Sequence, residues 1–265
     1  MLKLLPRFVA MAALGVAASM AHASDFKEIR IATEAGYPPF EYLNTDGDIV
    51  GYNIDIGNEI CKRLEAECIW MDQSFDSLIP GLQARKFDLA NSTMTATDAR
   101  RRVIDFSTPL YVVASRLVAH KDKHLEPTAE SLKGLRIGVQ QGTIMEAHAR
   151  KEWAPKGVTI VAYPSYTNAY LDLAVGRIDA SFQEAPNALE GFLSQPEGAD
   201  FALTGGTVTD SAMLNEPIAI GIRKGNKKLK AAVDQAILDM QADGTLKQIT
   251  DKHFEPGHIE LPSGQ

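Results

Sequence analysis

The sequence predicts an α/β fold made of two lobes, and three observations support this prediction. Along its 265 residues, short β-rich runs alternate with amphipathic helical runs, the pattern of strands connected by helices. The alternation falls into two cycles, which extended segments connect. Polar, turn-rich residues follow several of the strands, at the end where open α/β sheets bind ligands. We therefore expect a cleft between two lobes, with these strand ends facing it.

The first cycle occupies residues 29–95. Its expected strands are 29–33, 68–71 and 87–90, and its expected helices are 55–66 and 77–84. In the run 55–66, apolar residues stand at positions 56, 60 and 64 with charged residues between them, which predicts an amphipathic helix.

The second cycle begins at residue 135. Its expected strands are 135–139, 158–163 and 178–182, its expected helix is 166–175, and Gln141-Gly142-Thr143 opens another helix. A late strand over 218–223 and two helices over 229–241 and 244–253 complete the chain.

The N-terminus predicts export. Lys3 and Arg7 precede an almost wholly apolar run over 8–20, and Ala21-His22-Ala23 supplies small residues at the positions that a signal peptidase reads. This pattern is typical of a signal peptide cleaved after Ala23. A membrane anchor is the alternative, but the run is shorter than the roughly 20 residues that span a bilayer.

The charge argues against some partners. The chain has 27 Lys and Arg against 34 Asp and Glu, a formal net charge of -7, and cleavage would remove the two positive charges of Lys3 and Arg7 and leave -9. The sequence shows no obvious basic cluster, so we expect neither nucleic acid nor anionic lipid as a partner.

Two cysteines, Cys61 and Cys68, form a C-x6-C pair. In an oxidising compartment such a pair most simply forms one local disulfide, worth about 2–3 kcal/mol. Two buried free thiols are the alternative. A metal site is disfavoured because no histidine lies near the pair.

Several segments resemble one family over essentially the whole mature chain. The matching runs are IRIATEAGYPPFEY (29–42), GYNIDIGNEICKRLEAEC (51–68), FDSLIPGLQARKFDLANSTMTATDARR (75–101), SLKGLRIGVQQGT (131–143), GRIDASFQEA (176–185), EGFLSQP (190–196) and ADGTLKQITDKHF (242–254). They are similar to the periplasmic polar amino-acid binding proteins, specifically the lysine/arginine/ornithine and histidine binding group.

The resemblance implies a periplasmic receptor with the two-lobed periplasmic binding protein fold. One discontinuous lobe would comprise 24–111 and 216–265, and the other 112–215, with hinge crossings near 111–115 and 207–217. Such a protein closes around its ligand at the hinge and delivers it to an ABC importer. The resemblance implies a monomer that uses no cofactor and no metal.

The resemblance also assigns residues to the ligand's α-carboxylate and α-ammonium groups. Arg100 would grip the α-carboxylate, because a guanidinium bonds a carboxylate through two parallel hydrogen bonds. Ser92, Thr93 and Thr95 would bond both groups through hydroxyls and backbone amides. A solvated arginine and ordinary strand-ending residues are the structural alternatives.

The second lobe would complete this contact. Thr143 and Ile144 open a helix, whose free backbone amides suit an anion, so the Ile144 amide would meet the α-carboxylate. Glu184 stands where the family commonly carries aspartate and would bind the α-ammonium. An exposed surface carboxylate is the alternative.

The ligand side chain would meet aromatic and acidic residues. Tyr37 and Phe75 resemble the aromatic pair that sandwiches it, although two core aromatics are the alternative. Glu34 would pair with a distal cation, and Gln140 would hydrogen-bond a guanidinium or imidazole. These residues predict a cationic amino acid, with arginine, ornithine, lysine, histidine and arginine-derived opines left open.

Two other functions are compatible with parts of the sequence. Periplasmic cyclohexadienyl or arogenate dehydratases are similar to this family, and Glu184 could serve there as a general acid. A binding protein that feeds a chemoreceptor or sensor kinase is the other. The sequence holds no G-x-S-x-G motif, no P-loop and no metal-ligand histidine spacing, which favours a protein that binds without catalysis.

Overall fold

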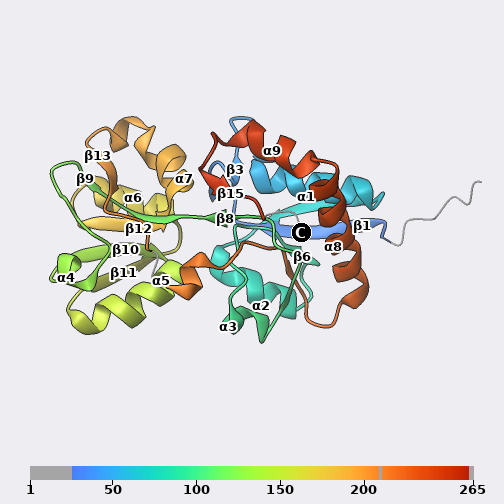
Figure 1. The fold of residues 1–265 in the computed structure, drawn as a ribbon, viewed down its shortest axis with the longest axis horizontal. Helices are drawn as coiled ribbons and strands as arrows, with labels where there is room; N and C mark the ends of the chain where they lie inside the picture. The colour runs from blue at the N-terminus through green and yellow to red at the C-terminus, as the bar shows by residue number, and fades with distance from the viewer. Residues whose placement is uncertain (1–25, 209–210, 263–265) are drawn as a thin grey trace, which may run out of the picture.

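The computed structural model describes residues 26–208 and 211–262, which form two lobes, each built around a five-stranded sheet (Figure 1). In the first lobe the strand order is β5 (Glu67–Asp72), β1 (Glu28–Thr33), β6 (Leu89–Ala90), β14 (Gly221–Ile222) and β7 (Asp105–Phe106). In the second lobe the order is β11 (Thr159–Tyr163), β10 (Arg136–Gln140), β12 (Ala180–Glu184), β9 (Ser115–His120) and β13 (Phe201–Thr204). The predicted two-lobed α/β fold is therefore correct.

Helices cover the sheet of the first lobe. They are α1 (Tyr52–Arg63), α2 (Leu78–Gln83), α3 (Asp98–Arg101), α8 (Lys227–Ala242) and α9 (Thr245–His253). Helix α1 begins three residues earlier than predicted, directly after Gly51, whose φ of 129° is unsuited to a residue with a side chain. A Cβ on Gly51 would lie 2.5 Å from the carbonyl oxygen of Phe40, so glycine lets this helix start close to the preceding turn.

Helices also pack in the second lobe. They are α4 (Ala129–Leu132), α5 (Ile144–His148), α6 (Tyr166–Ala174) and α7 (Ala185–Ala188), and a π-helical turn continues α5 over Ala149–Trp153. Strand β12 lies two residues later than the predicted 178–182, so Glu184 ends the strand rather than following it. Strands β9 and β13, which the sequence patterns did not predict, add to the sheet antiparallel to the strands beside them.

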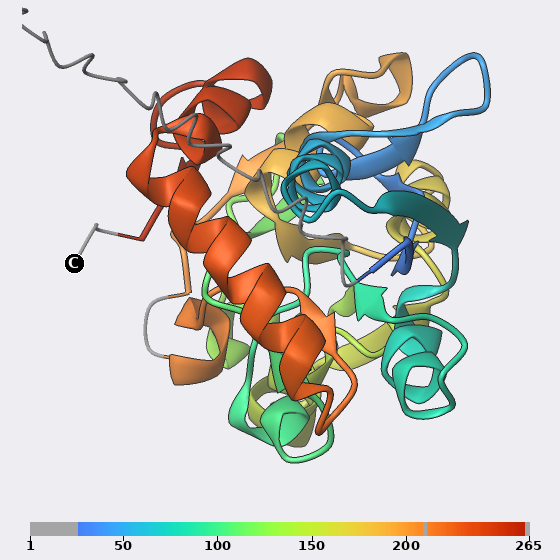
Figure 2. The same ribbon diagram turned by 90° about the vertical axis from the view of Figure 1, so that its right-hand side faces the viewer.

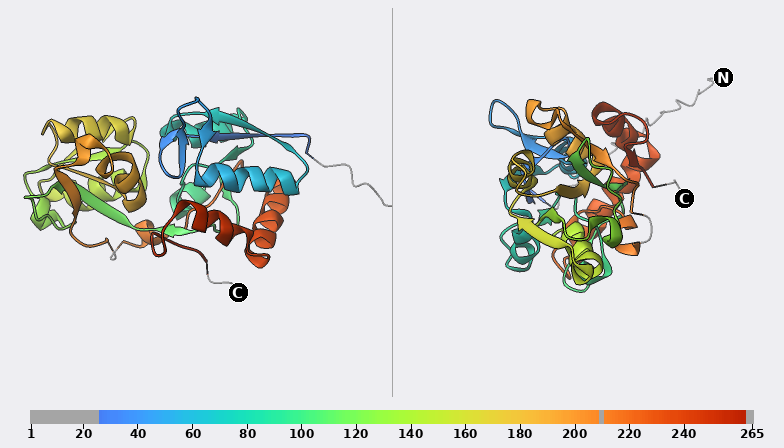
Figure 3. Two further views of the ribbon diagram at one scale, coloured as in Figure 1. Left: turned by 90° about the horizontal axis from the view of Figure 1, so that it is seen from above. Right: turned by 90° about the vertical axis from the view of Figure 1, so that its left-hand side faces the viewer.

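Two chain segments connect the lobes, as Figure 3 shows from above. The outgoing segment follows β7 and contains β8 (Val112–Val113), which pairs with β15 (Ile259–Glu260). The returning segment lies between β13 and β14, and its Ile218 bridges both Thr95 and Tyr111. A small sheet of β2 (Gly36–Tyr37), β3 (Glu41–Leu43) and β4 (Ile49–Val50) follows β1.

The predicted signal peptide, with its cleavage site after Ala23, lies outside the described residues. Within the described ranges, no helix combines the length and the apolar character needed to cross a bilayer.

Cys61 and Cys68 form the predicted disulfide, with their Cα atoms 5.8 Å apart. The bond joins the last turn of α1 to the beginning of β5, which pairs in parallel with β1 over its whole length. It therefore attaches a helix to the edge strand of the first sheet.

Replacing both cysteines by serine should lower the free energy of unfolding by about 2–3 kcal/mol, because opening a short loop restores conformational entropy to the unfolded chain. Urea unfolding of the two proteins measures the difference. The variant treated with reductant should match the untreated variant, whereas reductant should destabilise the parent chain. Equal stabilities of parent and variant would contradict the prediction.

Candidate functional site

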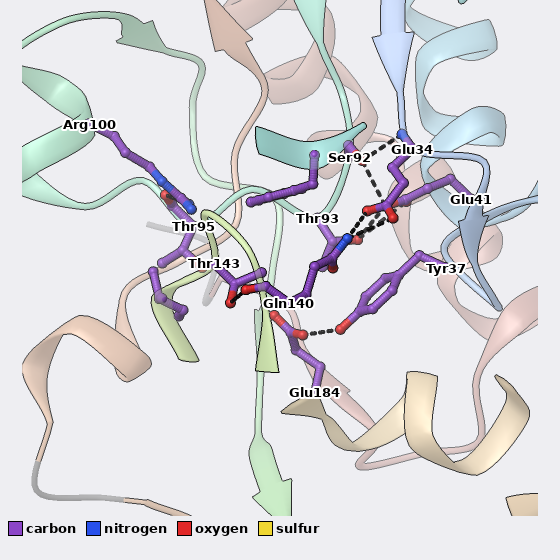
Figure 4. Close-up of a pocket in the computed structure, with 12 residues that line it drawn as sticks. Glu34, Tyr37, Glu41, Ser92, Thr93, Thr95, Arg100, Gln140, Thr143 and Glu184 are labelled. Atoms are coloured by element: carbon purple, nitrogen blue, oxygen red, sulfur yellow. Dashed lines mark hydrogen bonds between the residues drawn. The ribbon is translucent and has the colours of Figure 1, made fainter. Parts of the chain in front are cut away.

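A pocket lies between the two lobes (Figure 4). The structure brings all eleven residues of the predicted site to its wall, together with one residue that the sequence patterns did not indicate, Glu41. The first lobe contributes Glu34, Tyr37, Glu41, Phe75, Ser92, Thr93, Thr95 and Arg100, and the second contributes Gln140, Thr143, Ile144 and Glu184.

The carboxyl ends of parallel strands account for this convergence. Glu34 directly follows β1 and Ser92 follows β6, which lies beside β1 and parallel to it. In the second lobe, Gln140 ends β10 and Glu184 ends the parallel neighbour β12. Because parallel strands place their carboxyl ends along one edge of a sheet, each lobe presents polar side chains at the cleft.

Glu34 is a buried carboxylate that makes a hydrogen bond across the cleft. The side-chain amide Nε2 of Gln140 donates to both carboxylate oxygens at 2.7 Å, as Figure 4 shows. Within the described residues Glu34 forms no ion pair. Burial, with help from the charges of Asp72, Asp76 and Glu184, raises the pKa of Glu34 to about 7, although the Gln140 bond opposes the shift.

Glu184 makes the reciprocal contact from the second lobe. The hydroxyl of Tyr37 donates to its carboxylate, and the Tyr37 ring packs on Phe40 and Tyr166 with centroid distances of 5.8 and 5.7 Å. Burial raises the pKa of Glu184 to about 7, against the effects of the Tyr37 bond and the Arg100 charge. Tyr37 thus connects the two lobes as well as lining the pocket.

Arg100 is the cation of the pocket wall. The hydroxyl of Thr97 accepts from the Arg100 amide and caps α3, which fixes where the arginine side chain begins. Its guanidinium lies 5.4 Å from the centroid of the Phe75 ring and donates to the carbonyl oxygens of Thr95 and Gly142, both at 2.9 Å. Burial lowers the pKa of Arg100 to about 10, so the group stays charged at neutral pH.

Thr143 and Ile144 lie at the start of α5. The Thr143 hydroxyl accepts from the Glu146 amide at 3.2 Å and donates to the carbonyl oxygen of Gln140 at 2.7 Å. This cap holds the first turn of the helix against the end of β10. The helix start therefore faces the pocket opposite Arg100, whose guanidinium already reaches Gly142 in this segment.

Glu41 is the site residue that sequence reasoning missed. Its carboxylate is almost fully buried and accepts from Asn53 Nδ2 at 2.6 Å, from the Ser92 hydroxyl at 3.1 Å and from the Thr93 hydroxyl at 3.1 Å. The two hydroxyls, which were expected to meet a ligand, thus hold a carboxylate of the protein. The one available signal was an acidic residue directly after the apolar turn that ends at Phe40.

The Glu41 network continues to the segment that connects the lobes. The Tyr111 hydroxyl donates to Asn53 Oδ1 at 3.1 Å, and Tyr111 stands one residue before β8. Burial raises the pKa of Glu41 well above its usual range, with the Glu34 charge adding to the shift.

The fold and the pocket define a class: a two-lobed α/β protein with a charged pocket between its lobes. Residues 29–256 match the model of the bacterial extracellular solute-binding proteins, family 3, and the chain belongs to this family.

Named relatives cover most of the chain. It is 42% identical over 238 residues to the histidine-binding periplasmic protein of Escherichia coli K12, covering 90% of this chain and 92% of the relative. The lysine/arginine/ornithine-binding periplasmic protein of the same strain shows the same identity and coverage. A solved structure of a Salmonella typhimurium periplasmic binding protein with high arginine specificity superposes with a TM-score of 0.80 at 30% identity, over 86% of this chain and 100% of that one.

These relatives are named as binding proteins, and the dehydratase alternative with Glu184 as general acid finds no support among them. In this structure the Glu184 carboxylate accepts a hydrogen bond from the Tyr37 hydroxyl, and this bond connects the two lobes.

The ligand-free closed arrangement should be favoured at low pH. In an open cleft Glu34 and Glu184 would be solvated with ordinary pKa values, whereas the closed pocket raises both to about 7, so closure takes up protons. Small-angle scattering of ligand-free protein should therefore give a smaller radius of gyration at pH 5 than at pH 8. The double variant Glu34→Gln, Glu184→Gln should lose this dependence, and a parent radius that is equal at both pH values would contradict it.

Removing the Glu41 carboxylate should destabilise the first lobe. Glu41→Ala removes the acceptor of the Ser92 and Thr93 hydroxyls and one of the two acceptors of the Asn53 amide. Buried unpaired donors cost about 1–3 kcal/mol each, so we expect a loss of about 2–4 kcal/mol. Urea unfolding measures it. Glu67→Ala, at an exposed glutamate, is the matched control and should change stability by less than about 0.5 kcal/mol.

Proposed function

We propose that this protein captures a free cationic L-amino acid between its lobes and delivers it to an ABC importer. The observation that carries the proposal is the charge of the pocket: two buried carboxylates, Glu34 and Glu184, form no ion pair within the described chain and lie on the same pocket wall as Arg100. A buried charge without a partner is costly, so a ligand that supplies the missing charges is strongly favoured.

The charges of a cationic amino acid match this pocket group by group. Arg100 pairs with the α-carboxylate, assisted by the Ile144 amide at the start of α5, and Glu184 pairs with the α-ammonium. Glu34 pairs with the distal cation. Arg100 donates to two carbonyl oxygens, and these are neutral acceptors that an incoming carboxylate can outcompete.

Phe75 and Glu41 complete the proposed binding mode. Phe75 offers an aromatic face beside Arg100, and a cation above such a face gains about 0.5–2 kcal/mol. Glu41 lies on the same wall as Glu34, and Ser92 connects them by accepting from the Glu34 amide and donating to Glu41. The wall that faces the ligand side chain is therefore acidic, which favours a distal cation and disfavours glutamate.

The names of the relatives support a cationic ligand. Histidine, lysine, arginine and ornithine appear in the names of two Escherichia coli relatives, and the Salmonella protein is described as highly specific for arginine. We propose arginine or ornithine as the preferred ligand here, with lysine and histidine as further candidates, because the Glu34 carboxylate favours a distal cation.

The cellular setting follows from the same relationship. We propose export by a signal peptide cleaved after Ala23, a periplasmic location, a monomeric receptor and a membrane permease as partner. We propose lobes of 24–111 with 216–265 and of 112–215, which close at crossings near 111–115 and 207–217. The cross-cleft bonds of Gln140 and Tyr37 support closure as the step that buries the ligand.

Titration calorimetry against a panel of amino acids tests the proposal. Arginine and ornithine should bind at micromolar concentration or tighter, near 8 kcal/mol of net free energy, whereas glutamate and leucine should fail. Arg100→Ala should weaken every ligand by at least about 30-fold, because it removes a buried charged pair. Glu34→Gln should weaken only cationic ligands, by about tenfold or more.

Glu130→Gln makes the same chemical change at an exposed glutamate of the second lobe and should leave all affinities unchanged. Tight glutamate binding by the parent protein, or equal losses for cationic and neutral ligands in Glu34→Gln, would contradict the role given to Glu34.

A further inference from the structure

Folding gathers basic side chains on one edge of the first lobe, although the sequence shows no obvious basic cluster. They come from the residues after α2, the end of α3, the turn before α8 and the first residue of α8. We call this surface the basic edge, and its residues are Arg85, Lys86, Arg101, Arg102, Arg223, Lys224 and Lys227. The sequence patterns did not indicate this surface because its segments lie far apart along the chain.

Contacts hold the segments of the basic edge together. The Lys224 ammonium donates to the carbonyl oxygens of Arg101 at 2.7 Å and Arg102 at 3.2 Å. Strand β14, which precedes Arg223, pairs antiparallel with β6, which follows Lys86. Figures 1 and 2 show the turn before α8 beside the segment after α3, along the lower side of the first lobe.

The charge of the basic edge is not neutralised by ion pairs within the described residues. Many cations elsewhere are paired, such as Arg30 with Asp88, Arg63 with Glu59 and Arg136 with Asp179, but no residue of the basic edge forms such a pair there. Three carboxylates lie in the same segments, Asp88, Asp98 and Asp105, and Asp88 is paired with Arg30, which lies outside the basic edge. The seven cations of the basic edge still outnumber these anions. All basic-edge residues except the half-buried Arg223 are exposed.

A basic surface gives no advantage for collecting a cationic ligand, so its use lies elsewhere. A specific protein interface has an apolar core inside a polar rim. Among the large apolar side chains of these segments, within the described chain, only Val103 is exposed, at 42%. Long, exposed lysines and arginines spread over an edge instead match a surface of many phosphates, where each adds about 1 kcal/mol at the membrane.

We propose that the basic edge holds this protein against anionic phospholipid headgroups of a membrane surface. The pocket, lined by other residues, stays free to bind its ligand in this attached state. The remainder of the chain is acidic, since the whole carries a net charge of -7, and repulsion from the anionic surface turns that remainder away. Attachment therefore has a fixed orientation and weakens with salt.

Sedimentation of the full mature chain with vesicles tests this proposal. The parent protein should bind vesicles containing roughly 30 mol% phosphatidylglycerol at low salt, should not bind pure phosphatidylcholine, and should be released as salt rises. The triple variant Lys86→Gln, Arg102→Gln, Lys227→Gln should bind about 100-fold more weakly, at about fivefold for each charge removed. None of these three side chains contributes to the pocket, so amino-acid binding should be unchanged and shows that the variant is folded.

The matched control removes three charges from the second lobe instead: Lys133→Gln, Lys151→Gln, Lys156→Gln, at exposed positions. It has the same net charge as the basic-edge variant and should keep vesicle binding within about fivefold of the parent. Equal losses in the two triple variants would show that net charge alone acts and would overturn the proposal. The proposal would also be overturned if the parent protein did not bind anionic vesicles. This includes the outcome in which the basic edge binds the solubilised importer and not the vesicles.

Discussion

Buried carboxylate charge between the two lobes is the constraint on which the rest of the site depends. Glu34 and Glu184 lie in a closed pocket, and each accepts a hydrogen bond from a neutral group of the opposite lobe, Gln140 and Tyr37. Such bonds satisfy the oxygen atoms but leave the charge uncompensated, so burial keeps both pKa values near 7. Proton uptake by these two groups is one way in which the closed pocket can lose this charge.

The fold explains how opposite charges are kept apart in so small a space. Arg100 projects from the capped helix α3, and its guanidinium rests on Phe75 and on two carbonyl oxygens rather than on a carboxylate. If it paired with Glu184, the two charges would cancel and a zwitterionic ligand would have to break that pair. Helix capping and aromatic packing thus keep the Arg100 charge separate from the Glu184 charge.

Glu41 connects the pocket to the segments between the lobes through hydrogen bonds to Asn53 and Thr93. Thr93 and Asn53 contact both the Glu41 carboxylate and the hydroxyl of Tyr111, whose backbone bridges the returning segment at Ile218. The floor of the pocket and the two connecting segments are therefore parts of one buried network. The basic edge, by contrast, is a solvated surface on the outside of the same lobe.

The sequence by itself determined the α/β alternation, the helix and strand periodicity and, through family resemblance, eleven pocket residues, because these are encoded in local patterns and in strand ends. The C-x6-C spacing was compatible with a disulfide and with two free thiols, and the tertiary structure contains the disulfide. Only the tertiary structure identified Glu41, the Tyr37–Glu184 contact and the basic edge. Each depends on residues that lie far apart in sequence, and local periodicity carries no information about which distant side chains meet.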